Sequence, residues 1–564
     1  MEDAQMKTVS EGKLVGTVKG PGETPHQYIF ITSDNIDTRI GEFVYYHAPI
    51  GSDKKAIFGS ITERQLGRRL PDGFFSNPNI SPQAVSKLIG CELTRPELYE
   101  VTVTIKGYYE EEMREFVNPR ISPDPGQQIY LVSDRALTHA LSPRKFEETG
   151  SAHIGHLLTR DPDSVPVVLD VKDVVSTHLS ILAGTGSGKS YTAGVLIEEL
   201  MRPYNRAAVL VIDPHSEYSS LKQIESEPKF QEVGNYSPYV KIFQPDRVYI
   251  RISSLELGEI RALLPNMTEK MNYFLREAFN EAQNQSEMSD GSWSYRDLTL
   301  ELERMRVERG EKNPTDVITV DALRWRLDSK FNNSTLFRDR EHIPLKDLVR
   351  PGQCTVLQMS DIDVEDQRVI VATVLRRIYK ARIDTQKGQV SDPDHERYLN
   401  YPVFVILEEG HRFAPQGAIV TTTDLLKTVL SEGRKFGVGV AIISQRPGKL
   451  DQDVLSQCMT QIIMRIVNPI DQTSIASGVE SAGRDILNEL PALTKGQAVI
   501  AGSAINTPVL CQIRRRMTPH GGETLNAPEE WIKYFSDSRQ QKRCQDNSIY
   551  MPVSEKEFED GFEV

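Results

Sequence analysis

A glycine-rich segment that ends in Lys189 and Ser190 has the residue types and the spacing of a phosphate-binding loop. It follows a short, mostly apolar stretch and precedes an apolar-rich stretch at residues 191–201. Glycines let successive backbone N–H groups converge on a phosphate at the start of a helix, where the helix dipole favours anions. Lys189 would then reach the β- and γ-phosphates of ATP, and Ser190 would ligate Mg²⁺. The residues predicted to contact the nucleotide are Gly184, Thr185, Gly186, Ser187, Gly188, Lys189, Ser190 and Tyr191.

Two adjacent carboxylates, Glu408 and Glu409, follow a second apolar stretch at residues 403–407. Ligands of open α/β sheets bind where the strands end, so both side chains are expected near the phosphates. Glu408 would hold Mg²⁺ directly or through water, and Glu409 would polarise the water that attacks the γ-phosphate. The competing interpretation of Glu408 is an acidic residue that stabilises the N-terminus of a helix. The phosphate-binding loop upstream favours the catalytic interpretation.

Gln445 and Arg434 are two further candidates in the same part of the chain. Gln445 comes at the end of a third apolar stretch, where a polar side chain can sense the γ-phosphate. Arg434 ends a predicted helix at residues 423–434, and its guanidinium would stabilise transition-state charge if it reached the site of a neighbouring subunit. A single arginine at a helix end is more often a surface residue that complements the helix dipole. The residues alone leave both interpretations of Arg434 open.

Six apolar stretches predict the parallel sheet that would position these side chains. Apolar residues dominate each stretch, as expected of strands that are buried on both faces. Residues 256–345 interrupt the series with a helical periodicity, in which Met267, Met271 and Phe274 follow one stripe and are interpreted as core packing. The predicted strands are residues 179–183, 207–212, 354–358, 403–407, 438–444 and 461–467.

The first part of the chain, up to about residue 134, is rich in short β-type stretches. β-Branched and aromatic residues are frequent in them, and residues 101–105 alternate between apolar and polar, as in a strand with one buried face. Several short strands at this spacing predict a small antiparallel barrel or sandwich. The stretches are residues 13–19, 28–32, 42–47, 56–62, 99–105 and 128–132.

Together these patterns predict an α/β fold, with a RecA-like P-loop ATPase core, an N-terminal small β-barrel domain and a helical insertion. The arginine run at residues 514–516 is interpreted as part of a solvated segment. The predicted domains are the barrel (1–150), the first part of the core (151–255), the helical insertion (256–345), the second part of the core (346–515) and a C-terminal tail or brace (516–564).

Composition predicts a cytoplasmic protein that does not enter a membrane. The 564 residues carry a formal net charge of −13, and the five cysteines are scattered without a C-x-x-C pair, which argues against a disulfide framework or a structural zinc. The longest apolar runs fall far short of the ~20 residues that span a bilayer. The first residues of the chain contain no apolar segment of a secretory signal. The acidic balance does not exclude a nucleic-acid partner, because affinity for phosphates depends on where Lys and Arg are displayed.

Five motifs, taken in order, resemble the HerA group of hexameric DNA translocases. They are ILAGTGSGKS, VLVIDPHSEY, VFVILEEGHRF, SEGRKFG and ISQRP, and the resemblance covers about residues 10–515. The sequence departs from the family pattern in three places. Glu408 replaces the commoner Asp, Ser216 replaces a glycine, and Thr177 stands where many relatives carry an arginine.

The resemblance implies a ring of six subunits, with nucleotide bound between neighbours, double-stranded DNA in the central pore and Arg434 acting in trans. It also implies a partner: a NurA-like nuclease in DNA end processing, or a defence effector such as a sirtuin-like NAD hydrolase. By the same resemblance, Asp213 and Glu217 have structural or coupling roles. His215 and His411 are interpreted as hydrogen-bonded loop histidines, because no metal-ligand partners are spaced near them.

Two functions of different classes follow from these observations. In the first, ATP hydrolysis drives movement along double-stranded DNA, and the loops at residues 414–423 and 446–453 face the pore, with Arg446 and Lys449 as basic candidates. In the second, the chain is a nucleotide-controlled oligomeric scaffold that docks and activates an effector enzyme.

Overall fold

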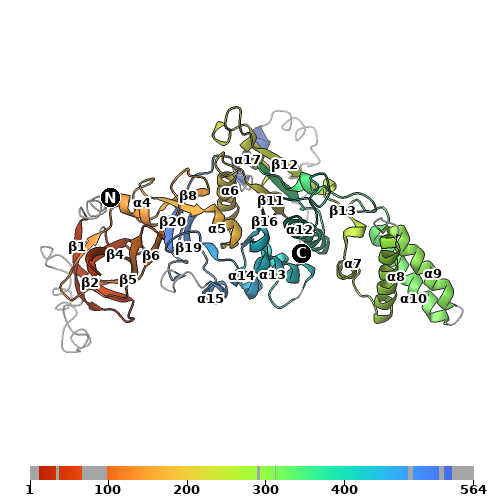
Figure 1. Cartoon of the computed structure of the whole chain (residues 1–564), viewed down its shortest axis with the longest axis horizontal. Helices are drawn as coiled ribbons and strands as arrows, with labels where there is room; N and C mark the ends of the chain where they lie inside the picture. The colour runs from red at the N-terminus through yellow and green to blue at the C-terminus, as the bar shows by residue number, and fades with distance from the viewer. Residues whose placement is uncertain are drawn as a thin grey trace, which may run out of the picture. The chain divides into compact units, whose positions relative to one another are not determined.

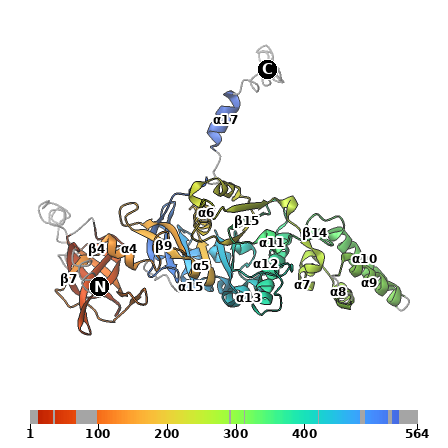
Figure 2. The ribbon, with the colours of Figure 1, turned by 45° about the horizontal axis from the view of Figure 1, so that its top comes forward.

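The computed structural model divides into two compact units, Met1–Pro519 and His520–Val564 (Figure 1). The second unit contains helix α17 (Ala527–Ser536), which Figure 2 labels. Most of the predicted C-terminal tail lies outside the described residues, as do Cys91, Cys544 and the first residues of the chain. The described residues are 12–33, 37–66, 98–288, 293–310, 313–418, 420–479, 487–519 and 526–536.

The N-terminal strands close into a barrel. The 7-stranded sheet has the order β2-β1-β7-β3-β4-β5-β6, and the additional pairing of β2 with β5 closes the ring, with β6 attached outside it. In β5 the side chains of Val101, Val103 and Ile105 are buried, as their alternation predicts. The predicted small barrel is therefore confirmed. The strands are β1 (Leu14–Pro21), β2 (Gln27–Thr32), β3 (Phe43–Ile50), β4 (Asp53–Leu66), β5 (Tyr99–Glu110), β6 (Glu115–Val117) and β7 (Gln128–Leu131).

An 11-stranded sheet forms the centre of the α/β part, in the order β12-β15-β11-β16-β17-β10-β18-β19-β20-β8-β9. Strands from β12 to β18 are parallel to their neighbours and contain all the predicted strands, so the predicted α/β core is confirmed. The antiparallel strands from β19 to β9 are not among those predicted. The strands are β8 (Ser151–Leu157), β9 (Pro166–Asp170), β10 (Leu179–Leu182), β11 (Ala208–Asp213), β12 (Tyr239–Phe243), β15 (Gln353–Gln358), β16 (Val403–Leu407), β17 (Val438–Ser444), β18 (Thr460–Met464), β19 (Gln497–Gly502) and β20 (Val509–Ile513).

The order of the parallel strands brings distant motifs to one edge of the sheet. β17 lies between β10 and β16, and Leu182 at the end of β10 is paired with Ser444 at the end of β17. Because the three strands are parallel, the glycine-rich loop after β10, Gln445 after β17 and Glu408 after β16 all emerge at the same edge.

Helices cover the sheet, and three of them form the predicted helical insertion. α8, α9 and α10 pack together (Figures 1 and 2), with Met271, Phe274 and Leu323 buried in the apolar core as the stripe predicts. The short strands β13 (Ile250–Arg251) and β14 (Phe337–Arg338) pair at the base of this insertion. The helices of the first unit are α4 (Asp134–Ala140), α5 (Val171–Ser176), α6 (Lys189–Leu200), α7 (Leu257–Leu263), α8 (Glu269–Met288), α9 (Tyr295–Gly310), α10 (Pro314–Phe331), α11 (Leu345–Leu348), α12 (Val364–Gln386), α13 (Thr421–Phe436), α14 (Gln452–Ser456) and α15 (Pro469–Gly478).

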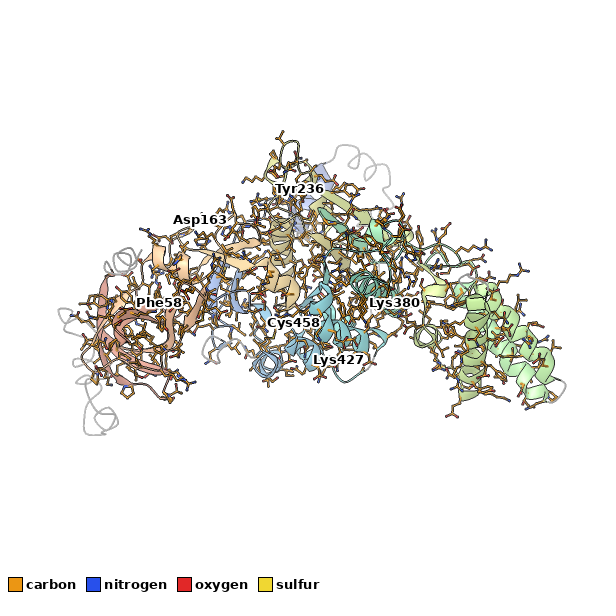
Figure 3. The ribbon with its side chains drawn as sticks, in the orientation of Figure 1. Phe58, Asp163, Tyr236, Lys380, Lys427 and Cys458 are labelled. Atoms are coloured by element: carbon orange, nitrogen blue, oxygen red, sulfur yellow. The ribbon has the colours of Figure 1, made fainter. Side chains whose placement is uncertain are left out.

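The described cysteines are buried free thiols. Cys354, Cys458 and Cys511 are each enclosed in the apolar core, and Figure 3 labels Cys458. Burial raises the pKa of the Cys458 thiol to about 12, so this side chain behaves as a small apolar group. None of the described helices is both long enough and apolar enough to cross a bilayer.

Candidate nucleotide-binding site

The loop between β10 and α6 has the backbone geometry that its glycines allow. Gly186 and Gly188 have φ angles of +76° and +106°, in a region that other residues rarely adopt. The backbone N–H of Gly184 donates to the carbonyl of Arg465 (2.8 Å), and Ser187 Oγ donates to the carbonyl of Gly184 (2.8 Å), which fixes the outer half of the loop. The first amides of α6 have no acceptor within the helix and are available to a phosphate.

Lys189 is the first residue of α6, and its ammonium group lies between two carboxylates. Its Nζ is 3.1 Å from Glu408 Oε1 and 2.6 Å from Glu409 Oε1. Burial lowers the pKa of Lys189, but the attraction of the two carboxylates outweighs burial and raises this pKa above its usual value. The amine therefore stays charged, as a group that binds phosphate must.

Glu408 comes directly after β16 and is fully buried. Its Oε2 atom has no hydrogen-bond partner among the residues that the structure describes. Burial raises the pKa of Glu408 to about 7, Lys189 lowers it, and the nearby carboxylates of Glu409 and Glu217 raise it. A buried oxygen without a partner costs free energy. The Oε2 atom of Glu408 is therefore still available to accept a hydrogen bond from a ligand.

Glu409 is also buried, and its backbone is left-handed, with a φ angle of 54°. That conformation costs about 1 kcal/mol for a residue with a side chain. Glu409 Oε2 lies 3.3 Å from His411 Nδ1, which is 3.2 Å from Ser444 Oγ. From the sequence, His411 is expected to be a hydrogen-bonded loop histidine, and the structure adds it to the site. The Glu-x-His spacing after an apolar strand is the signal that could have found this contact.

A third carboxylate, that of Glu217, reaches the site from the loop after β11. Ser190 Oγ donates to Glu217 Oε2 and lies 3.1 Å from Glu408 Oε1. Asp213, buried at the end of β11, accepts the backbone N–H groups of Glu217 (3.1 Å) and Tyr218 (3.2 Å) and so fixes the turn that presents Glu217. Burial raises the pKa of Asp213 to about 6. The contact between Glu217 and Ser190 is not predicted from the sequence.

The oxygen atoms around Ser190 fit a hard divalent cation. The Ser190 hydroxyl lies within hydrogen-bond distance of the Glu408 and Glu217 carboxylates. Mg²⁺ prefers such oxygens, and it commonly combines one or two protein ligands with water and substrate phosphates. The described part of the chain contains no group of three or more His, Cys, Asp or Glu that could hold a metal ion by itself. Ser190 and Glu408 are the residues that would hold Mg²⁺.

The remaining predicted site residues lie at different places. Gln445 and the outer residues of the loop, such as Thr185, line a cavity of about 650 Å³. Tyr191, in the first turn of α6, accepts the backbone N–H of Arg516 with its hydroxyl oxygen (2.7 Å). Arg434 is exposed in the last turn of α13, which leads into the start of β17, so it lies at the sheet edge opposite to Gln445. The structure therefore does not bring Arg434 into the site of its own chain.

The arginine run at residues 514–516 is largely buried against α6, so the prediction of a solvated segment was wrong there. Arg514 pairs with Glu198 (2.9 Å) and Glu199 (2.8 Å), both of them buried on α6. The Arg516 side chain is 2% exposed and packs on Gly194, where an added Cβ would lie 2.5 Å from Arg516 Cζ. A charge run does not reveal its partners, which here lie 316 residues earlier in the chain.

A phosphate-binding loop after one parallel strand, and paired carboxylates after another, define the class of P-loop ATPases. Residues 152–378 match the sequence family described as the central domain of helicase HerA. The chain is 30% identical over 425 residues to the probable helicase MJ1565 of Methanocaldococcus jannaschii. That alignment covers 75% of this chain and 77% of the relative. It is 28% identical over 559 residues to the DNA double-strand break repair helicase HerA of Pyrococcus furiosus, with 92% of this chain and 97% of that protein covered.

The chain belongs to the HerA family of helicases, and the prediction of an ATP-hydrolysing enzyme of this family is confirmed. Among solved structures, VirB4 of Thermoanaerobacter pseudethanolicus superposes with a TM-score of 0.47 at 14% identity, covering 66% of this chain and 98% of that chain. The assignment to the family rests on the sequence matches.

Proposed function

We propose that the chain hydrolyses ATP with Mg²⁺ to move along double-stranded DNA, as a ring of six copies that processes DNA ends in double-strand break repair. The observation that carries this proposal is the meeting of Lys189, Ser190, Glu408 and Glu409 at one sheet edge beside the glycine-rich loop. The relative from Pyrococcus furiosus, which covers 92% of this chain, is named a DNA double-strand break repair helicase, and this supports the choice of substrate.

The site residues take distinct roles in hydrolysis. The amides at residues 186–190 hold the β-phosphate, and Lys189 leaves the carboxylates for the β- and γ-phosphates. That movement frees Glu409 to accept a proton from the attacking water. Mg²⁺ held by Ser190 and Glu408 would neutralise charge on the phosphates. Gln445, between the ends of β10 and β16, senses the γ-phosphate.

The place of Arg434 supports assembly into a ring. β17 has 7 residues and separates Arg434 from Gln445, and a strand of that length spans about 20 Å. Arg434 therefore stabilises the transition-state charge in the site of a neighbouring copy, as an arginine supplied in trans. A ring of six copies gives each site such a neighbour and leaves a pore for the duplex.

The motor acts on DNA ends together with a partner nuclease of the NurA kind. A defence effector such as a sirtuin-like NAD hydrolase would instead be the partner in an anti-phage role. Purification of the chain with the product of the neighbouring gene, followed by assays for nuclease and NAD hydrolysis, distinguishes the two roles.

DNA-stimulated ATP hydrolysis tests the proposed function. Lys189→Ala is expected to abolish nucleotide binding, and Glu409→Gln is expected to bind ATP but not turn it over. Lys387→Ala, which removes an exposed lysine after α12, is the matched control and should hydrolyse ATP like the unmodified chain. Unchanged turnover in Lys189→Ala or Glu409→Gln would refute the proposal.

Mixed assemblies test whether Arg434 acts in trans. Neither Arg434→Ala nor Lys189→Ala should hydrolyse ATP alone. When the two variants are mixed, a Lys189→Ala copy supplies its arginine to the intact loop of an Arg434→Ala copy, so part of the activity should return. Absence of any recovery, in mixed assemblies whose size matches the unmodified protein, would refute the role in trans.

A further inference from the structure

The last turn of α13, which carries Arg434, packs against one face of α12. The two helices lie side by side (Figures 1 and 2). Tyr379, Arg382 and Gln386 follow each other at intervals of three and four residues, so they share a face of α12. The Tyr379 ring on that face meets the ring of Phe436, the last residue of α13, edge-on, with 5.8 Å between the centroids.

Arg382 ties the end of α13 to a second segment of the chain. Arg382 is 3% exposed, and its Nε donates to the carbonyl of Phe436 (2.7 Å). Nη1 of the same guanidinium donates to the carbonyl of Leu399 (2.7 Å), shortly before β16. The donors of a guanidinium have a fixed, planar arrangement. The two bonds therefore set the distance between the end of α13 and the segment that leads into β16.

Two further side chains of α12 hold the same turn. The hydroxyl of Tyr379 donates to Glu432 Oε2 (3.0 Å). In the amide orientation that satisfies both of its groups, Gln386 donates to the carbonyl of Lys435 (3.1 Å) and accepts from Arg382 Nη2 (2.8 Å). Carbonyls in the last turn of a helix have no partner within the helix, and helix ends fray. Here α12 supplies partners to two of these carbonyls, which restricts the movement of the turn.

Arg434 lies between the residues that α12 holds. Its side chain is exposed, and its carbonyl accepts the N–H of Gly437 (3.4 Å), which ends the helix with a φ angle of +70°. Because the side chain is exposed, the fold sets its starting point, which is the backbone of the last turn. A group that acts on a reacting phosphate has to be placed accurately, since a displacement of about 1 Å can lower a rate about 100-fold.

We propose that Arg382, together with Tyr379 and Gln386, positions Arg434 for the nucleotide of the neighbouring copy. The proposal rests on the proposed function, in which Arg434 acts in trans. Arg382 is a positioning residue, because it is buried and acts through the last turn of α13. Its loss should therefore impair the arginine that a copy gives to its neighbour and leave the nucleotide site of the same copy intact.

Arg382→Met tests the proposal in the full chain. Its ATP turnover should fall about tenfold or more, while its dissociation constant for ADP with Mg²⁺ stays that of the unmodified chain. Arg377→Met is the matched control, because Arg377 is on the same helix and donates to the carbonyl of Ile343 (3.0 Å), before α11. The control should keep the turnover of the unmodified chain. Unchanged turnover in Arg382→Met would overturn the proposal.

Tyr379→Phe is a milder variant that keeps the ring against Phe436. It removes one hydroxyl and its bond to Glu432, so turnover should fall about threefold with unchanged ADP binding. If Arg382→Met does not fold, unchanged turnover in Tyr379→Phe overturns the proposal.

Mixed assemblies distinguish a defect in giving the arginine from a defect in receiving it. A Lys189→Ala copy keeps its arginine but does not bind ATP, so mixing it with Arg382→Met should restore part of the turnover. An Arg434→Ala copy keeps its loop but gives no arginine, so mixing it with Arg382→Met should restore little. The reverse pattern, or no recovery in either mixture, would overturn the proposal. Failure of the proposed function gives a different result, because Lys189→Ala and Arg434→Ala would then not restore each other.

Discussion

Two clusters of buried charge lie along α6, and each joins a pair of adjacent glutamates to a basic side chain. At the start of the helix, Lys189 meets the two carboxylates that follow β16. In its second half, Glu198 and Glu199 of the helix itself meet Arg514. The residue types are similar, but the two clusters differ in how many of the carboxylate oxygens have partners.

In the second cluster, each of the four carboxylate oxygens of Glu198 and Glu199 accepts a hydrogen bond. Glu198 Oε1 accepts the backbone N–H groups of Met517 (2.9 Å) and Thr518 (2.9 Å), and Glu199 Oε2 accepts the hydroxyl of Tyr204 (2.9 Å). In the first cluster, Glu408 Oε2 has no hydrogen-bond partner among the described residues, and Glu409 Oε2 lies 3.3 Å from His411 Nδ1 without a hydrogen bond. Full partnering stabilises a fold, whereas spare acceptors leave a site able to bind. This difference is consistent with the proposed catalytic role of the first cluster and favours a structural role for the second.

The largest expected difference between the clusters is in catalysis. Glu409→Gln keeps the size of the side chain but removes the base, so ATP turnover should fall about 10³-fold. Glu199→Gln makes the same change in the second cluster and should leave the turnover of folded protein within about threefold. Steady-state hydrolysis, normalised to folded protein by circular dichroism, measures both. A loss of less than tenfold in Glu409→Gln would contradict the assignment.

Arg514→Met should reverse this pattern. It removes the cation that hydrogen-bonds to Glu198 and Glu199 and leaves them only the longer ion-pair contacts with Arg516 and Arg202, both at 3.7 Å. Breaking a buried ion pair in this way costs about 3–5 kcal/mol. Urea denaturation should therefore show a lower midpoint, while the folded fraction still hydrolyses ATP. A midpoint equal to that of the unmodified chain would show that this cluster does not stabilise the fold.

Asp213, which fixes the turn that brings Glu217 beside the first cluster, should make stability depend on pH. Burial raises the pKa of Asp213 from 3.8 to about 6, so the protonated carboxyl is more favourable in the folded chain than in the unfolded chain. Its contribution to stability is full below about pH 4 and is lost as the pH rises through 6, a change of about 2–3 kcal/mol. Asp213→Asn removes this titration. Between pH 4 and pH 7, the variant should gain stability relative to the unmodified chain in urea denaturation, and parallel pH curves would contradict the prediction.

The smallest expected effect concerns packing against the second cluster. Gly194→Ala places a methyl group against the Arg516 guanidinium and should cost about 1–2 kcal/mol. Gly258→Ala in α7 is the matched control, because no atom lies within 4 Å of the added Cβ. The control should gain about 0.5–1 kcal/mol. Equal thermal denaturation midpoints for the two variants would show that the Arg516 side chain moves away from the added methyl group without a loss of stability.

The sequence predicted the parts of the fold whose signals are local. Strong apolar patterns mark three such parts, and the structure contains each of them. They are β10, which precedes the loop that ends in Lys189, β16, which precedes Glu408, and the helices of the insertion. β19, β20, β8 and β9 were not predicted, because they come from both ends of the core and join the sheet only through antiparallel pairing with each other and with β18. Short stretches of that kind carry no sign of their partner.

The candidate site was predicted in the same uneven way. The loop and the paired glutamates stand in motifs, so their residue types and spacing were sufficient. The contact of His411 with Glu409, the reach of Glu217 to Ser190 and the cavity beside the glycine-rich loop depend on how separate loops fold over one edge. The buried role of Arg514 was hidden for the same reason, since its partners are on a helix near the other end of the core.

The left-handed backbone of Glu409 has a consequence for variation of this chain. A glycine at position 409 would relieve about 1 kcal/mol of strain in a turn that now has a φ angle of 54°, but it would also remove the buried carboxylate that lies 2.6 Å from Lys189. The strained backbone and the ion pair therefore act on the stability of the fold in opposite directions at this one residue. On the proposed function, a glycine variant would bind ATP without turning it over, whichever of the two contributions is larger.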